Sequence, residues 1–149
     1  MKKHCILFIL LLLTAACGEN SSTPEQQVKK VIANIEQGIE EGSLSQVVDH
    51  IDDYYIDHNG WTKKDITRYL QLQILRNQNI TLLSRITSLE ISKNTASVEL
   101  SVASAARGTN LTIEANRLKA DIHNISIVLN NSSGSWNIVS SSWDNKNSL

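Results

Sequence analysis

The 149-residue sequence lacks most of the features that mark common enzyme and nucleic-acid-binding classes. It has only two cysteines, Cys5 and Cys17, and Cys5 lies in an apolar N-terminal run, so the fold depends on packing and not on a disulfide framework. Its 14 lysines and arginines stand singly or in pairs against 15 acidic residues, which argues against the basic patch that a phosphate backbone requires. There is no G-x-S-x-G motif to mark a nucleophilic serine.

The N-terminal residues resemble a bacterial lipoprotein signal. Lys2 and Lys3 precede an apolar run that is shorter than the roughly 20 residues of a membrane-spanning helix. Residues 13–18 read Leu-Thr-Ala-Ala-Cys-Gly, which resembles the lipobox whose cysteine accepts a diacylglyceryl group. We expect residues 1–16 to be a signal peptide and Cys17 to be the first residue of the mature chain. The Cys17 thiol would carry a lipid with palmitate as a fatty-acyl chain. The alternative is an ordinary secretory signal with an unrelated cysteine.

The mature chain implied by this cleavage is one small domain on a lipid anchor. It has 133 of the 149 residues, which suits one hydrophobic core, and its net charge falls to −3. Residues 17–23 are small and polar, as in a flexible tether, and residues 24–149 form the domain. Gly18 follows the lipidated cysteine instead of the aspartate that commonly retains lipoproteins in the inner membrane. We therefore expect an outer-membrane protein that faces the periplasm.

The first part of the domain has the pattern of three amphipathic helices. Thr23, Pro24 and Gln26 have the spacing of a capped helix start, and apolar residues then recur every three or four positions until Gly42. A shorter helix follows directly, and a third begins after Thr62. The three apolar faces consist of Val28, Val31, Ile32, Ile35 and Ile39; of Leu44, Val47, Val48 and Ile51; and of Ile66, Tyr69, Leu70 and Ile74.

After Asn79 the pattern changes to the alternation of apolar and polar residues that is typical of strands. Residues 95–102 and 125–129 show it most clearly, and a final strand ends near residue 143. Three helices followed by about four antiparallel strands predict an α+β domain in which a curved sheet wraps the long first helix.

The order and spacing of these elements resemble the nuclear transport factor 2-like superfamily. The resemblance is carried by the acidic turn at 40–43, the segment 53–60 and the ending 134–143, and it covers residues 24–144. It implies a cone-shaped fold, with three N-terminal helices packed in the concave face of a curved, mostly antiparallel sheet of four to six strands. The superfamily includes ketosteroid isomerases, polyketide cyclases and small bacterial lipoproteins, so it implies a pocket and not a reaction. Many members form homodimers through the exposed sheet face, which makes a second copy an expected partner.

The segment 49–58 concentrates four carboxylates and two imidazoles. A calcium loop does not fit, because aligning Gly60 with the loop glycine leaves Ile66 where the closing glutamate should stand. His50, His58 and an aspartate could bind a transition metal if the end of the helix brought them together. Otherwise the aspartates face solvent and a tyrosine packs in the core.

The same segment allows a catalytic interpretation. Tyr55 and Asp57 lie on one side of an extended chain, and isomerases of the resembling superfamily combine a carboxylate base with a tyrosine. His123 has the strand parity of Ile125, so it faces the concave side unless a bulge beside it, indicated by the phase shift after Ile122, turns it to solvent. These three polar residues are the candidates if the domain is a small isomerase or lyase.

The implied cone predicts a mostly apolar pocket opposite the first helix. Its expected lining residues are Val98, Leu100, Ile125, Ile127 and Trp143. Trp136 and Trp143 are seven residues apart and face opposite sides of a regular strand, so one should pack on the first helix and the other should lie near the pocket mouth.

No metal or cofactor is implied. We therefore expect a non-catalytic domain that binds a small apolar molecule or an envelope protein, and the isomerase or lyase remains the alternative.

Overall fold

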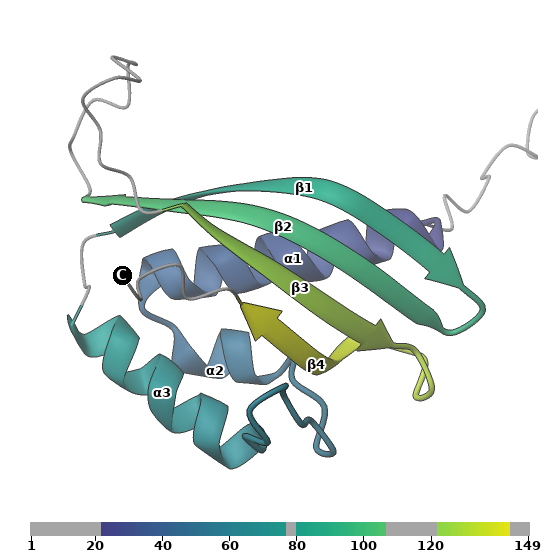
Figure 1. Ribbon diagram of the computed structural model, residues 1–149, viewed down its shortest axis with the longest axis horizontal. Coiled ribbons are helices and arrows are strands. Elements are labelled where there is room, and N and C mark those ends of the chain that lie inside the picture. Colours follow the sequence, from purple (N-terminus) through teal and green to yellow (C-terminus); the bar gives the residue numbers. More distant parts are fainter. Residues whose placement is uncertain (1–21, 77–79, 107–121, 144–149) are drawn as a thin grey trace, which may run out of the picture.

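The computed structural model describes residues 22–76, 80–106 and 122–143, so the expected signal peptide and Cys17 lie outside the described residues. The elements in chain order are α1 (Pro24–Glu41), α2 (Leu44–Val48), α3 (Lys63–Arg76), β1 (Ile80–Ser92), β2 (Thr95–Ala106), β3 (Ile122–Asn130) and β4 (Asn137–Trp143). The helices cover one face of a curved antiparallel sheet with the strand order β1-β2-β3-β4 (Figure 1). The predicted α+β class and the three-helix, four-strand order are confirmed.

The first helix begins and ends where the sequence predicts, because both ends are capped. Thr23 Oγ1 accepts a hydrogen bond from the Gln26 N–H (3.2 Å), and Gln26 Oε1 accepts one from the Thr23 N–H (2.9 Å). Gly42 ends α1 with φ of 72°, a left-handed conformation that glycine adopts without strain. Gly38 allows α2 to approach closely, since a Cβ there would come within 2.9 Å of Val47 Cγ2.

The other two helices are less regular than expected. The short α2 ends at Val48, and Ile51, expected on its apolar face, instead forms an isolated bridge with Ile138 of β4. Asp65 Oδ2 accepts hydrogen bonds from both the N–H and the hydroxyl of Thr62, which fixes the start of α3. Within the described ranges, no helix is long and apolar enough to span a membrane.

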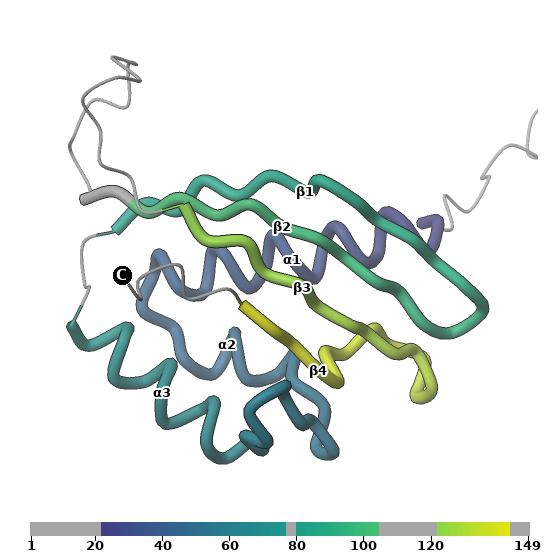
Figure 2. The backbone as a smooth tube through the Cα atoms, in the orientation of Figure 1, coloured from purple at the N-terminus to yellow at the C-terminus, as the bar shows by residue number. Residues whose placement is uncertain are grey.

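The sheet is a meander of long strands that bend over α1 (Figure 2). Two register shifts accompany the bend: Thr87 is an extra residue in β1 against β2, and Val139 is an extra residue in β4 against β3. The strands β2 and β3 pair without a shift, so the bulge predicted beside His123 is wrong. The alternation of apolar residues changes phase at Ile122 because this apolar side chain lies on the outer face of the sheet, where it is 62% exposed.

The bulge at Val139 also changes the expected placement of the tryptophans. Because it inserts one residue, Trp136 and Trp143 both face inward although seven positions separate them. Trp136 is buried and its Nε1 donates a hydrogen bond to Gln27 Oε1 of α1 (3.2 Å). Trp143 instead lines a cavity. The expectation that one tryptophan packs on the first helix holds, but opposite strand parity is not the reason.

The outer edge of β4 is covered by the segment that the sequence marked as rich in carboxylates and imidazoles. The Ile138 N–H donates to the His50 carbonyl (2.8 Å), and the Ile138 carbonyl accepts from the Asp52 N–H (2.9 Å). The Ile56 N–H donates to the Val139 carbonyl (3.1 Å). These bonds pair backbone N–H and C=O groups at the edge of β4, and they hold the segment beside the concave face of the sheet.

The closed core lies between the first half of α1 and the β1–β2 hairpin end of the sheet. Val28, Val98 and Leu129 are fully buried there. Towards the other end, α3 completes the helical layer (Figure 1), and the side chains no longer fill the space between helices and sheet. The candidate functional site lies in this open part of the fold.

Candidate functional site

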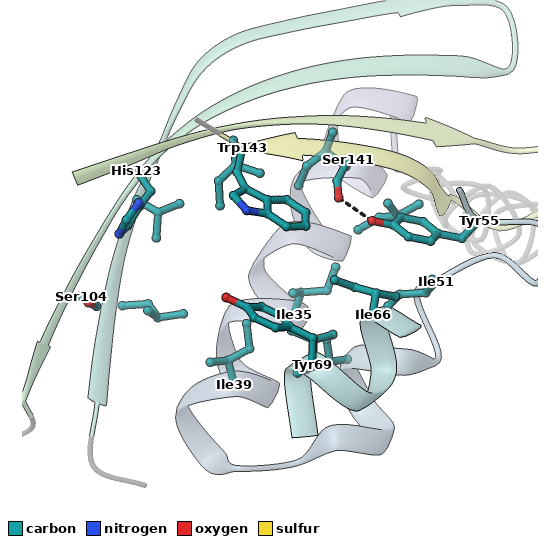
Figure 3. A pocket seen from close by; sticks show the side chains of 17 residues that line it. Ile35, Ile39, Ile51, Tyr55, Ile66, Tyr69, Ser104, His123, Ser141 and Trp143 are labelled. Carbon is teal, nitrogen blue, oxygen red and sulfur yellow. Dashed lines mark hydrogen bonds between the residues drawn. The ribbon is translucent and has the colours of Figure 1, made fainter. Parts of the chain in front are cut away.

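A cavity of about 340 Å³ lies between the second half of α1, α3 and the concave face of the sheet (Figure 3). This volume lies within the range of small-molecule sites, about 300–1,000 Å³. The helical layer and the segment after it contribute Ile35, Ile39, Val47, Ile51, Tyr55, Ile66, Tyr69 and Leu70. The strands contribute Leu82, Val102, Ser104, His123, Ile125, Ile127, Ile138, Ser141 and Trp143.

The structure places three of the five expected pocket residues in the lining: Ile125, Ile127 and Trp143. Val98 and Leu100 do not line this cavity, which corrects the expectation. They are 0% and 5% exposed and belong to the closed core, because the first half of α1 packs on their part of the sheet. The cavity begins one inward position further along β2, at Val102.

The cavity has polar side chains at both ends, and the Tyr69 hydroxyl and the Trp143 indole nitrogen lie between them (Figure 3). At one end, Tyr55 Oη is 2.6 Å from Ser141 Oγ. At the other end, His123 and Ser104 extend from β3 and β2. His123 therefore faces the concave side, as its strand parity indicated, but it does not meet Tyr55.

Asp57 is only 5% exposed, yet it serves the backbone and not the cavity. Its Oδ1 accepts hydrogen bonds from the N–H groups of Asn59 and Trp61, each at 2.8 Å, which fixes the turn before α3. Its Oδ2 is buried and has no hydrogen-bond partner among the described residues. Because Asp57 does not line the cavity, the three candidate catalytic groups do not converge.

The Tyr55 hydroxyl is held in its protonated form. Burial raises the pKa of Tyr55, the hydrogen bond with Ser141 opposes this, and the negative charge of Asp57 raises the pKa further. At neutral pH the phenol is therefore a hydrogen-bonding group and not a base. This chemistry suits recognition of a polar atom on a bound molecule.

Aromatic rings gather around Trp143 at the cavity. Its ring centroid lies 6.3 Å from that of Tyr69, in nearly parallel planes, and 6.0 Å from that of Trp61. The His58 ring contacts it edge-on at 5.4 Å. These separations are typical of favourable aromatic pairs. The cluster connects the end of β4 with α3 and gives the cavity a flat aromatic wall.

The two histidines proposed as metal ligands have different partners. His50 Nε2 lies 3.3 Å from Asn34 Nδ2, and burial lowers the pKa of His50 while Asp49 opposes this shift. His58 Nδ1 lies 3.4 Å from the Ser141 carbonyl oxygen. Across residues 22–76, 80–106 and 122–143, no three His, Cys, Asp or Glu side chains are placed to hold a metal ion. The structure does not bring the hypothetical ligands together.

Solved structures share this architecture, whereas no family model and no curated protein matches the sequence. A domain of unknown function with a cystatin-like fold from Nostoc punctiforme has a TM-score of 0.65 at 12% identity, over 86% of this chain and 82% of that one. A nuclear transport factor 2-like protein of unknown function from Shewanella oneidensis has a TM-score of 0.62 at 11% identity, over 81% and 98%. This chain has the nuclear transport factor 2-like fold.

Another similar structure is Bd1075 of Bdellovibrio bacteriovorus, with a TM-score of 0.63 and 11% identity. The match covers 79% of this chain but only 39% of Bd1075, so this chain corresponds to part of that longer protein. At such low identities the likeness establishes the fold, and the cavity must be interpreted from its own residues.

Two residues at this site could not be assigned from the sequence: Ser141, which lines the cavity, and Trp61, whose ring packs against that of Trp143 in the cavity wall. Ser141 is one of three consecutive serines, and only the bulge at Val139 decides that it faces inward. Trp61 follows a turn and precedes α3, where no periodicity indicates the direction of its side chain. Val102 did carry a signal, because it alternates in phase with Leu100.

Proposed function

We propose that this chain is a lipid-anchored outer-membrane protein whose periplasmic domain binds a small apolar molecule and catalyses no reaction. The cavity is the observation that carries the binding role, since it is lined mainly by Ile, Leu, Val and aromatic side chains. Packed cores rarely leave voids larger than a water molecule, so an apolar space of about 340 Å³ is a feature of a binding site. The anchor is supported by the N-terminal residues, above all Cys17.

The Ile125→Trp substitution tests the binding role by filling the cavity. Ile125 is half-buried on the concave face, so the larger ring should enter empty space and cost less than the roughly 1–3 kcal/mol of an overfilled core. Binding of the fluorescent reporter N-phenyl-1-naphthylamine should weaken at least about tenfold, because the indole occupies the reporter's volume. Ser97→Trp, on the exposed face of β2, is the matched control and should bind like the wild type.

Two results together would contradict this function. The first is a loss of more than about 3 kcal/mol in the free energy of unfolding of Ile125→Trp, measured in urea. The second is the absence of any bound ligand in wild-type protein, from native mass spectrometry and the reporter titration. The cone would then be solid, and function would have to be sought on the surface.

A small isomerase or lyase of the ketosteroid isomerase or polyketide cyclase type is the second candidate. One observation favours it: Asp57 Oδ2 is buried and unpaired among the described residues, and its charge acts on Tyr55. A base in that position would have to turn into the cavity, which it does not line. Proton exchange next to the carbonyl of a bound ketone, followed by NMR in deuterated water, distinguishes the enzyme from the binding protein.

A second copy of the chain is the protein partner that we propose. Leu83, Ala103 and Ile122 stand in register across β1, β2 and β3 on the outer face of the sheet. Leu83 and Ile122 are 52% and 62% exposed, and contiguous exposed apolar groups of this kind commonly mark association sites. A homodimer through this face would leave the cavity on the opposite face accessible.

A further inference from the structure

The hydroxyl groups of Tyr55 and Ser141 hold more hydrogen-bonding capacity than they use. They lie 2.6 Å apart, so one donates to the other. Two hydroxyls carry two protons, and a single bond between them uses one. No other hydrogen bond to either hydroxyl occurs in the described part of the chain, so one O–H remains unused whichever group donates.

The unused O–H lies where a bound molecule can reach it. Tyr55 and Ser141 both line the cavity, and their neighbours in the lining include Ile51, Ile127 and Ile138. In such apolar surroundings an O–H donor without a hydrogen-bond partner is unfavourable. A ligand that supplies an acceptor removes this cost and so binds more tightly. The pair is therefore a directional recognition point at one end of a mostly apolar space, apart from His123 and Ser104 at the other end.

The charges around the pair decide which acceptor fits. No Lys, Arg, Asp or Glu occurs among the described residues that line the cavity, and His123 lies at the end opposite the pair, so an anion held by the pair would be buried without a cation beside it. The Asp57 charge close to Tyr55 disfavours a second negative group, and the protonated phenol remains available as a donor. A neutral oxygen needs no counter-ion and meets the O–H directly.

We propose that the ligand is an uncharged molecule with an apolar body and one carbonyl, ether or hydroxyl oxygen, which accepts a hydrogen bond from the Tyr55–Ser141 pair. This inference rests on the proposed binding function and specifies its ligand class. The cavity volume and the aromatic wall formed by Trp143 and Tyr69 suit a body of one or two fused rings, given that an engineered cavity of about 150 Å³ holds benzene.

Three probes with the same ring system test the ligand class on the purified full chain. They are 2-ethylnaphthalene, 2-acetylnaphthalene and 2-naphthoate, each measured at pH 7.5 by displacement of N-phenyl-1-naphthylamine. The ketone should bind about 2–10-fold more tightly than the hydrocarbon, the gain of one net hydrogen bond. The carboxylate should bind at least about tenfold more weakly than the ketone, because its charge has no cation beside the Tyr55–Ser141 pair.

Variants show whether the hydroxyl pair causes this preference. Tyr55→Phe and Ser141→Ala should each keep it, since one O–H remains, whereas the double variant should bind ketone and hydrocarbon equally. Ser142→Ala, the next residue of β4 and outside the cavity lining, is the matched control and should keep the preference. The relative affinities of the three probes for the wild-type protein can be measured without any variant. The ligand class is therefore tested even if Tyr55→Phe fails to fold.

The outcomes separate this inference from the function on which it rests. Equal binding of ketone and hydrocarbon by the wild type would overturn the ligand class but leave apolar binding intact. Tightest binding of the carboxylate would also overturn it. A ketone preference that survives in the double variant would overturn the role of the pair. Failure of all three probes to bind would overturn the proposed function itself.

Discussion

His50 lies where α1, the end of α2 and β4 meet. Its Nε2 is 3.3 Å from Asn34 Nδ2, and in this amide orientation the neutral imidazole accepts a hydrogen bond from the amide. Its carbonyl oxygen also accepts the Ile138 N–H that ties this segment to β4. Burial lowers the pKa of His50 because the charged ring would lose its hydration, and Asp49 offsets only part of this.

The sign of this shift predicts a loss of stability in mild acid. The pKa of His50 is lower in the folded state than in the unfolded state, so its contribution to stability is complete above pH 6.5 and is lost as the pH falls from there towards the folded pKa. Urea unfolding at pH 7.5 and 5.5 should show a loss below about 1 kcal/mol, since the ring is partly solvated. His50→Gln, which does not titrate, should remove this pH dependence, and identical pH slopes for both proteins would contradict the assignment.

For the helices and strands, the residues that cap a helix could be recognised in the sequence, whereas the β-bulges could not. Both ends of α1 were predictable because the Thr23 cap and Gly42 are specific residue types in specific places. The bulges at Thr87 and Val139 have no such marker, and each reverses which residues face inward beyond it. Ser141 therefore could not be assigned to the cavity from its position among three serines.

The extent of the cavity could not be predicted from the sequence either. Alternation correctly placed Leu100 and Ile125 on the same face of the sheet, where they are register partners. Alternation cannot say which of them lies beneath α1 and which faces open space, because that depends on where the helix crosses the sheet. Leu100 is consequently in the core and Ile125 in the cavity wall.

The outer face of the sheet supplies a prediction about assembly. Sedimentation velocity of the wild-type protein should show a dimer, and Ile122→Asp should shift it towards monomer by at least about tenfold in dissociation constant, since a buried unpaired carboxylate costs several kcal/mol. Tyr54→Asp is the control, because Tyr54 is 90% exposed and lies in the segment between α2 and α3. A wild type that is monomeric at all concentrations, or an Ile122→Asp protein that dimerises like the wild type, would reject this interface.

For the whole molecule, the proposed anchor and the cavity have a common physical logic. Residues 17–23 span at most about 25 Å when fully extended, so a lipid on Cys17 would keep the domain close to the bilayer surface. Small apolar molecules partition into bilayers, because apolar surface is expelled from water. A tethered domain with an apolar cavity is therefore held where such molecules are concentrated, whereas a freely diffusing domain would meet them rarely.

Cys17→Ser removes the thiol to which the lipid would be attached and leaves residues 24–149 unchanged. Cells fed a clickable palmitate analogue should label the wild-type protein and not this variant, because a serine hydroxyl does not replace the thiolate nucleophile. In density fractionation the wild type should accompany the outer membrane, and the variant should appear as a soluble or unprocessed form. Cys5→Ser is the matched control: Cys5 lies within the expected signal peptide, so labelling should persist. Persistent labelling of Cys17→Ser would show that the lipid is attached elsewhere, and an unlabelled wild type would leave the domain without the anchor that concentrates its ligand.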